Sequence, residues 1–123
     1  MSTSDLTPDQ FAHKLWYTET NCHLYDWGDH GLAMGPYQEH PDWLWDWAHK
    51  LTMPPRSMES WASWEGRLVR GFYQWHMRYY PILAPVEVAM HFHLGHIVFM
   101  GNEKWDHRYA ERFELAPAEP QLT

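Results

Sequence analysis

Four polar side chains interrupt an apolar stretch that runs from residue 82 to residue 100: Glu87, His91, His93 and His96. Glu87 and His91 are four residues apart, so on a helix they share a face and can share a hydrogen bond or a proton. His93 and His96 are three residues apart and lie on a nearly opposite face. A helix with polar groups on two sides needs neighbours on two sides. The sequence therefore predicts that Glu87 and His91 pack against a partner or a water-filled pocket.

Metal binding is a competing chemistry for the same histidines, because imidazole nitrogen is a common ligand of Zn²⁺. On one helix His91 and His93 point about 200° apart, so His93 and His96 can chelate together only if another segment completes the site. On a strand His91 and His93 would share a face. No second His or Cys cluster has a diagnostic ligand spacing. We therefore expect no metal and keep a site of His91, His93 and His96 as the alternative.

A catalytic role is the third chemistry to consider, because a histidine beside a carboxylate is a reasonable acid/base pair. No nucleophile motif, phosphate-binding loop or cofactor fingerprint accompanies the pair. Ser57, Ser60 and Ser63 are read as helix-start residues. We therefore predict a non-catalytic protein with no cofactor.

The composition limits what kind of protein surrounds these residues. A chain of 123 residues allows one domain, and the 17% aromatic share includes nine Trp and seven Tyr. Trp and Tyr suit protein interfaces and the headgroup belt of a bilayer. A net charge of −7 argues against nucleic-acid binding. The single Cys22 excludes an intrachain disulfide, and we expect no cleavable targeting segment in "MSTSDLTPDQ".

Short helices and loops are predicted for residues 1–56, a Trp-rich N-terminal extension. Thr7, Pro8 and Gln10 form a T-x-x-Q capping box at the start of a first helix. A second helix begins near Pro41, where "PDWLWDWAHKL" places Trp residues four apart on one face. The alternation of tryptophans at 43, 45 and 47 leaves a strand as the alternative there.

An amphipathic helix is predicted for residues 57–80, beginning at Ser57. Its large apolar side chains recur at spacings of three and four: Trp61, Trp64, Leu68, Phe72, Trp75 and Tyr79. A basic amphipathic helix of this kind lies in a membrane interface, and a soluble bundle helix is the alternative. We predict that its basic and aromatic residues bind lipid, cardiolipin or another phospholipid: Arg67, Arg70, Trp75, Arg78 and Tyr79.

One long transmembrane helix with a polar extension is predicted for residues 81–113, because no proline follows Pro85 before Phe113. As a helix, residues 82–100 are about 28 Å long, close to the hydrocarbon thickness. Their aliphatic and Phe residues favour insertion by about 4 kcal/mol, and a buried carboxylate opposes it by about 3 kcal/mol. Glu87 and the histidines must therefore face protein or water, and Gly95 permits close helix approach. Residues 114–123 are predicted to be a polar C-terminal tail.

The order of these segments resembles subunit f of mitochondrial ATP synthase. The family shows an arginine, a small residue and clustered aromatics before one transmembrane helix, and "RLVRGFYQWHMRYY" supplies the matching residues: Arg70, Gly71, Phe72, Tyr73, Trp75, Arg78 and Tyr79. The family's basic, Tyr-rich end resembles "KWDHRYAERF", with Lys104, His107, Arg108 and Tyr109. The resemblance covers residues 67–113. The tryptophan-rich first 57 residues match nothing in it, and family spans normally lack a glutamate and three histidines.

The resemblance implies an all-α accessory subunit of the membrane (Fo) part of a proton-translocating ATP synthase. It implies a structural role in a multisubunit complex of the mitochondrial inner membrane, beside the proton-conducting subunit, in support of proton transport and ATP synthesis. Three alternatives stay open: a subunit of another respiratory complex, a helical metal-binding protein, and a soluble interaction protein with Trp-lined surfaces.

Overall fold

The computed structural model describes residues 6–20, 27–28, 33–34, 37, 41–54, 58–94 and 105–120. The described helices are α1 (Pro8–Thr20), α2 (Pro41–Lys50), α3 (Trp61–Tyr79), α4 (Pro85–Leu94) and α6 (His107–Leu115). Two-residue strands β1 (Trp27–Gly28) and β2 (Ala33–Met34) pair antiparallel, with Trp27 opposite Met34. The predicted all-α class is confirmed, with this short strand pair as an addition.

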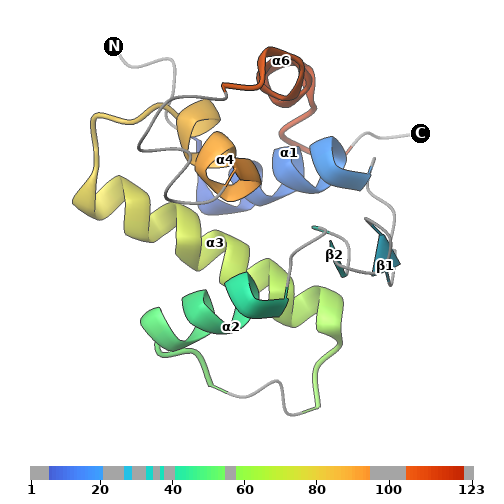
Figure 1. Cartoon of the computed structure of the whole chain (residues 1–123), viewed down its shortest axis with the longest axis vertical. Helices are drawn as coiled ribbons and strands as arrows, with labels where there is room; N and C mark the ends of the chain where they lie inside the picture. The colour runs from blue at the N-terminus through green and yellow to red at the C-terminus, as the bar shows by residue number, and fades with distance from the viewer. Residues whose placement is uncertain are drawn as a thin grey trace.

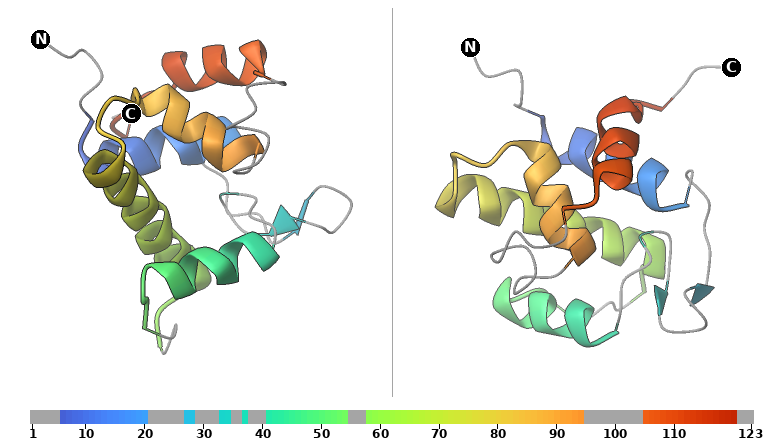
Figure 2. Two further views of the ribbon diagram at one scale, coloured as in Figure 1. Left: turned by 60° about the vertical axis from the view of Figure 1, so that its left-hand side comes forward. Right: turned by 45° about the horizontal axis from the view of Figure 1, so that its top comes forward.

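The long helix α3 lies between the other helices. It contacts α2 on one side and both α1 and α4 on the other, and α6 packs against α1 and α4 (Figures 1 and 2). The core between them contains side chains from each helix, including Phe11, Leu44, Phe72, Val88 and Phe113. One hydrophobic core therefore joins segments from both ends of the chain.

Helix α1 begins as its sequence predicts. The Thr7 N–H donates to Oε1 of Gln10 at 2.9 Å, and the Gln10 N–H donates to Oγ1 of Thr7 at 3.1 Å. This reciprocal capping box satisfies two N–H groups that have no partner within the helix. Phe11 follows directly and stacks on Tyr73 of α3, with ring centroids 4.3 Å apart.

Helix α2 is also confirmed, and the strand alternative for its tryptophans is wrong. Trp43 and Trp47 lie on one face with ring centroids 6.2 Å apart, and Trp47 meets Phe72 of α3 edge to face at 4.6 Å. Leu44 on the same side is fully buried. On a strand the three tryptophans at 43, 45 and 47 would share one face. On the helix Trp43 and Trp47 face the core, whereas Trp45 is 56% exposed.

Helix α3 begins at Trp61, with Ser60 as its N-cap: Oγ of Ser60 accepts the Ser63 N–H at 3.1 Å. Ser57, the predicted start, lies outside the described residues. The predicted aromatic face is covered by the chain itself, because Trp64, Leu68 and Phe72 are buried in the core. Only the ends of that face reach solvent, so the expectation of a helix lying along lipid is corrected to a helix central to a bundle.

The predicted single helix through residues 81–113 is wrong. Asp106 has an extended backbone (φ −93°, ψ 97°) and caps α6, because its Oδ1 accepts the Tyr109 N–H at 3.1 Å. Helix α6 then lies against α4 instead of continuing it (Figure 2). An N-cap carboxylate marks the start of a new helix, and the absence of proline between Pro85 and Phe113 does not reveal it. No helix within the described ranges is both long and apolar enough to cross a bilayer.

The segment after α6, predicted as a polar tail, packs on α1. Nζ of Lys14 donates to the carbonyl oxygens of Glu114 at 3.1 Å and Ala116 at 2.8 Å. Nε2 of Gln10 donates to Oε1 of Glu119 at 3.0 Å. These contacts fix the described part of the tail to the first helix.

Candidate functional site

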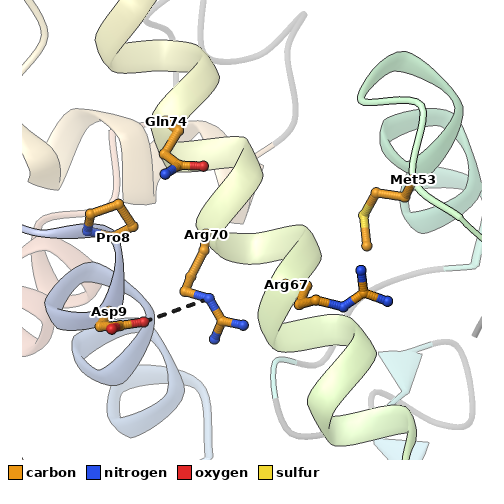
Figure 3. Close-up of a pocket in the computed structure, with 6 residues that line it drawn as sticks. All are labelled: Pro8, Asp9, Met53, Arg67, Arg70 and Gln74. Carbon is orange, nitrogen blue, oxygen red and sulfur yellow. Dashed lines mark ion pairs between the residues drawn. The ribbon is translucent and has the colours of Figure 1, made fainter. Parts of the chain in front are cut away.

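A cavity of about 500 Å³ opens where the start of α1, the face of α3 and the segment after α2 meet. Its lining residues come from those three places: Pro8, Asp9, Met53, Arg67, Arg70 and Gln74 (Figure 3). The three α3 residues are spaced by three and four, so the helix places them on one face. The opposite face of α3 is the buried one, and the cavity therefore lies on the polar side of the central helix.

Arg67 is held in place by an acidic partner. Its Nε donates to Oε2 of Glu59 at 3.3 Å and its Nη2 donates to Oε1 of the same carboxylate. Ser63 donates its hydroxyl to Oε2 of Glu59 at 2.9 Å. The guanidinium is thereby oriented, while the Arg67 side chain remains 38% exposed.

Arg70 has a looser partner. Its Nε lies 3.6 Å from Oδ1 of Asp9, beyond hydrogen-bond distance, and the Asp9 side chain is 87% exposed. One turn earlier, a Cβ at Gly66 would lie 3.3 Å from Nη1 of Arg70, so the glycine leaves space for the guanidinium. Figure 3 shows Arg70 reaching toward Asp9 of α1 and Arg67 reaching toward the Met53 side. The two cations therefore lie at different sides of one cavity.

This arrangement is suited to binding anions. A guanidinium stays protonated at all ordinary pH values and offers five N–H donors that match carboxylate or phosphate oxygens. Gln74 adds an amide that can donate. The cavity lining has no serine, cysteine or histidine. Three of its side chains, Arg67, Arg70 and Gln74, are donors that can bind an acidic group.

The structure divides the five residues that were predicted to bind lipid. Arg67 and Arg70 line the cavity, whereas Trp75, Arg78 and Tyr79 lie at the C-terminal end of α3. Arg78 lies over the Tyr79 ring at 5.5 Å, and Nζ of Lys50 lies over the Trp75 ring at 4.2 Å. Lipid binding at both places stays a prediction.

The expected hydrogen bond between Glu87 and His91 is not formed in the described structure. Oε1 of Glu87 accepts the Ala84 N–H at 2.8 Å, just before α4 begins. Nδ1 of His91 instead lies 2.6 Å from Nε2 of His76 on α3. A carboxylate in the first turn is closer to the N–H groups at the helix start, and this contact replaces the predicted one. Packing of this face against a partner subunit stays a prediction, and Gly95 lies outside the described residues.

His76 is the partner that sequence reasoning missed. Its Nδ1 lies 2.7 Å from the carbonyl oxygen of Phe72, so that nitrogen carries hydrogen. When both rings are neutral, Nε2 of His76 is therefore the acceptor in the bond between the two histidines, and Nδ1 of His91 is the donor. His76 and His91 are 1% and 4% exposed. The available signal was that His76 falls four residues after Phe72, on the same face as the buried aromatics.

The other histidines bear on the predicted metal alternative of His91, His93 and His96. Nε2 of His93 lies 3.0 Å from Oδ2 of Asp106, and the His93 ring stacks on Tyr109 with centroids 3.9 Å apart. His91 points into the core toward α3, so the structure separates it from His93. His96 lies outside the described residues. Within the described ranges, no three His, Cys, Asp or Glu side chains are grouped to hold a metal ion.

A second contact between ionisable groups, partly buried, joins α1 and α6 and was also missed. The Tyr109 hydroxyl donates to Oε2 of Glu19, and Nη2 of Arg112 donates to the Thr18 carbonyl oxygen. Burial raises the pKa of Glu19 to about 7, against the opposing effects of Tyr109 and Arg112. Burial and the Glu19 charge raise the pKa of Tyr109 well above its ordinary value. Because 90 residues separate the two partners, local sequence patterns contain no signal for this contact.

The comparisons with known proteins identify no relative. No protein-family model matches the chain, and neither a curated protein nor a solved structure matches it. The function must therefore be inferred from the geometry of the described residues.

Proposed function

We propose that this protein is a non-catalytic helical binding protein whose cavity takes a small anion of the phosphate or carboxylate type. The observation that carries the proposal is the pair of arginines, Arg67 and Arg70, that reach from α3 toward different sides of one accessible cavity in a protein of net charge −7. Each arginine has a carboxylate beside it, Glu59 for Arg67 and Asp9 for Arg70, so the cavity is locally balanced in charge in a chain of net charge −7. The long Arg70–Asp9 contact leaves the Arg70 guanidinium able to exchange that exposed carboxylate for another anion.

The two arginines differ in how they would meet the ligand. Arg67 is oriented by Glu59 and supplies a fixed positive charge. Arg70 is paired only loosely with exposed Asp9, so an incoming oxygen can take the place of that carboxylate. Charge-assisted hydrogen bonds to a guanidinium are stronger than neutral ones. Specific binding is therefore expected to depend chiefly on Arg70.

The test uses inorganic phosphate and pyrophosphate as probes. A ligand that binds only the folded state raises the midpoint of thermal unfolding, and the rise grows with ligand concentration. We expect both anions to stabilise the wild-type chain more than sodium chloride of equal ionic strength. Arg70→Gln should remove the difference, and Arg70→Lys should retain part of it.

Arg78→Gln is the matched control, because Arg78 is exposed on the same helix and outside the cavity. It should respond to phosphate as the wild-type chain does. Equal stabilisation by phosphate and chloride, or the same loss in Arg78→Gln, would contradict the proposal.

A second proposal follows from the resemblance to subunit f: a structural accessory role in the Fo part of mitochondrial ATP synthase, at the inner membrane. The all-α fold is consistent with this role, and the exposed aromatic and basic residues at the end of α3 favour contact with a membrane assembly. The proposed partners are other membrane subunits, including the proton-conducting one, and cardiolipin. The same features are compatible with another respiratory complex.

Copurification tests the second proposal. An affinity-tagged chain, isolated from its native mitochondria in mild detergent, should bring ATP synthase subunits with it and migrate with the intact complex on a native gel. Recovery of a different respiratory complex, or of the chain alone, would exclude the ATP synthase role. The cavity experiment uses the isolated chain, so the two proposals succeed or fail separately.

A further inference from the structure

The turn between α3 and α4 has an unusual surface. Its tip, residues 78–82, has the sequence Arg-Tyr-Tyr-Pro-Ile, and all five residues are exposed. Tyr79 is 57% exposed, Tyr80 44% and Ile82 91%. The turn lies at the outer edge of the molecule in each view (Figures 1 and 2). Single exposed apolar residues are common on proteins, but a continuous run of this kind at a projecting turn marks a contact surface.

The backbone of the tip is ordered by hydrogen bonds. The Tyr80 N–H donates to the His76 carbonyl oxygen at 2.7 Å, which ends α3, and the Leu83 N–H donates to the Tyr80 carbonyl oxygen at 3.0 Å. Pro85 then begins α4. The side chains of Tyr79, Tyr80 and Ile82 are therefore presented from a fixed turn, and little ordering is needed when they meet a partner.

Aromatic rings and two cations surround the tip. Trp75 lies under it, with ring centroids 5.1 Å from Tyr79 and 5.6 Å from Tyr80. Lys50 covers the Trp75 ring and Arg78 covers the Tyr79 ring. Each cation thus sits beside an aromatic ring at the edge of the apolar surface, with its charge open to solvent.

Two acidic residues of the described chain lie close in sequence to the tip and to Lys50. Glu87 is the nearest acid along the chain, and its carboxylate is held by the Ala84 N–H at the start of α4. Asp46 lies one turn before Lys50 on the exposed side of α2. Among the described residues, neither Lys50 nor Arg78 forms an ion pair with a carboxylate, so both cations at the edge of the apolar surface can meet an anionic partner.

We propose that the tip formed by residues 78–82, together with Lys50 and Trp75, docks on an anionic lipid surface without spanning it. Ile82 enters the outer acyl region, the tyrosines occupy the headgroup level, and Arg78 and Lys50 meet lipid phosphates. A bilayer surface changes from apolar acyl chains through headgroups to charged phosphates, and this order matches an aliphatic tip, aromatic rings and cations. An acidic protein surface does not offer that order. The inference concerns a surface separate from the arginine cavity and does not depend on anion binding there.

The test is flotation of the purified chain with vesicles. One vesicle type is pure phosphatidylcholine, and the other mixes phosphatidylcholine with phosphatidylglycerol. We expect the chain to float with the mixed vesicles, less with the neutral ones, and less again as salt screens the cations. Ile82→Asp should lower the vesicle partition coefficient about tenfold, because it removes a buried aliphatic side chain and adds a charge of the wrong sign.

Met58→Asp is the matched control, because Met58 is 98% exposed outside the tip. It introduces the same charge and should leave flotation unchanged. Both variants should keep the wild-type unfolding midpoint, since both positions are exposed. Arg70→Gln should also float normally, which separates this surface from the cavity.

Three outcomes would overturn the inference. The first is a wild-type chain that binds neither vesicle type. The second is an equal loss of binding in Met58→Asp and Ile82→Asp. The third is self-association of the chain that Ile82→Asp abolishes, with no binding to vesicles. The last result would assign the tip to contact with a second copy of the chain.

Discussion

Glu19 makes the stability of the contact between α1 and α6 depend on pH. Because burial raises its pKa to about 7 from an ordinary value of 4.5, the folded state keeps a proton that the unfolded chain releases. Stability linked to this group is therefore complete below pH 4.5 and is lost as the pH rises toward and through 7. Each pK unit of difference corresponds to about 1.4 kcal/mol. At the residue scale, one carboxyl group thus makes the contact weaker in alkaline solution.

Glu19→Gln tests this linkage. The amide oxygen can still accept the Tyr109 hydroxyl, but the group no longer ionises. We expect the variant to match the wild-type free energy of unfolding near pH 4 and to exceed it by on the order of 1–3 kcal/mol at pH 8. Urea unfolding at several pH values measures the difference. Glu111→Gln, on the exposed side of α6, should show no such divergence. A constant difference between Glu19→Gln and wild type at all pH values would refute the linkage.

At the scale of elements, the histidine pair joins α3 to α4. Removing one partner leaves the other with an uncompensated polar atom in the core, which typically costs about 1–3 kcal/mol. His76→Leu and His91→Leu should each be destabilising, and the double variant should lose less than their sum by roughly 0.5–3 kcal/mol. Urea unfolding of the four proteins gives the coupling energy directly.

The same experiment with Glu87→Leu and His91→Leu is the control cycle. These two residues have different partners in the structure, so their coupling energy should be smaller than that between positions 76 and 91. Strong coupling in the control, with additivity between positions 76 and 91, would restore the pairing that the sequence predicted.

The elements also show what sequence patterns can establish. The start of α1 was predictable because Thr7 and Gln10 complete each other's hydrogen bonds within four residues. What covers the apolar face of α3 was not predictable, because lipid and other helices both remove apolar surface from water. The break before α6 depended on Asp106 and on contacts with α4 that no local pattern contains.

At the scale of the whole molecule, the candidate site was predictable only in part. Arg67 and Arg70 were predicted to bind lipid from their place on a basic helix face, and the structure places both in the cavity lining. Their companions Pro8 and Asp9 come from the first helix, and only the packing of α1 on α3 brings them to the cavity. The expected division into an extension, an interfacial helix and a span also gave no reason to expect one core that draws on all three.

The packing of residues 114–119 on α1 has a consequence for how the chain folds during synthesis. Ribosomes extend a protein from its N-terminus, and α1 emerges early, but Lys14 and Gln10 meet partners 100 and 109 positions further along. Phe11 likewise packs against Phe113, with ring centroids 5.6 Å apart. Helix α3 can cover part of the apolar face of α1 earlier, but the part that meets Phe113 stays uncovered until this late segment has left the exit tunnel. Closure of the core waits for this late segment, and until then the nascent chain displays apolar surface of the kind that chaperones recognise.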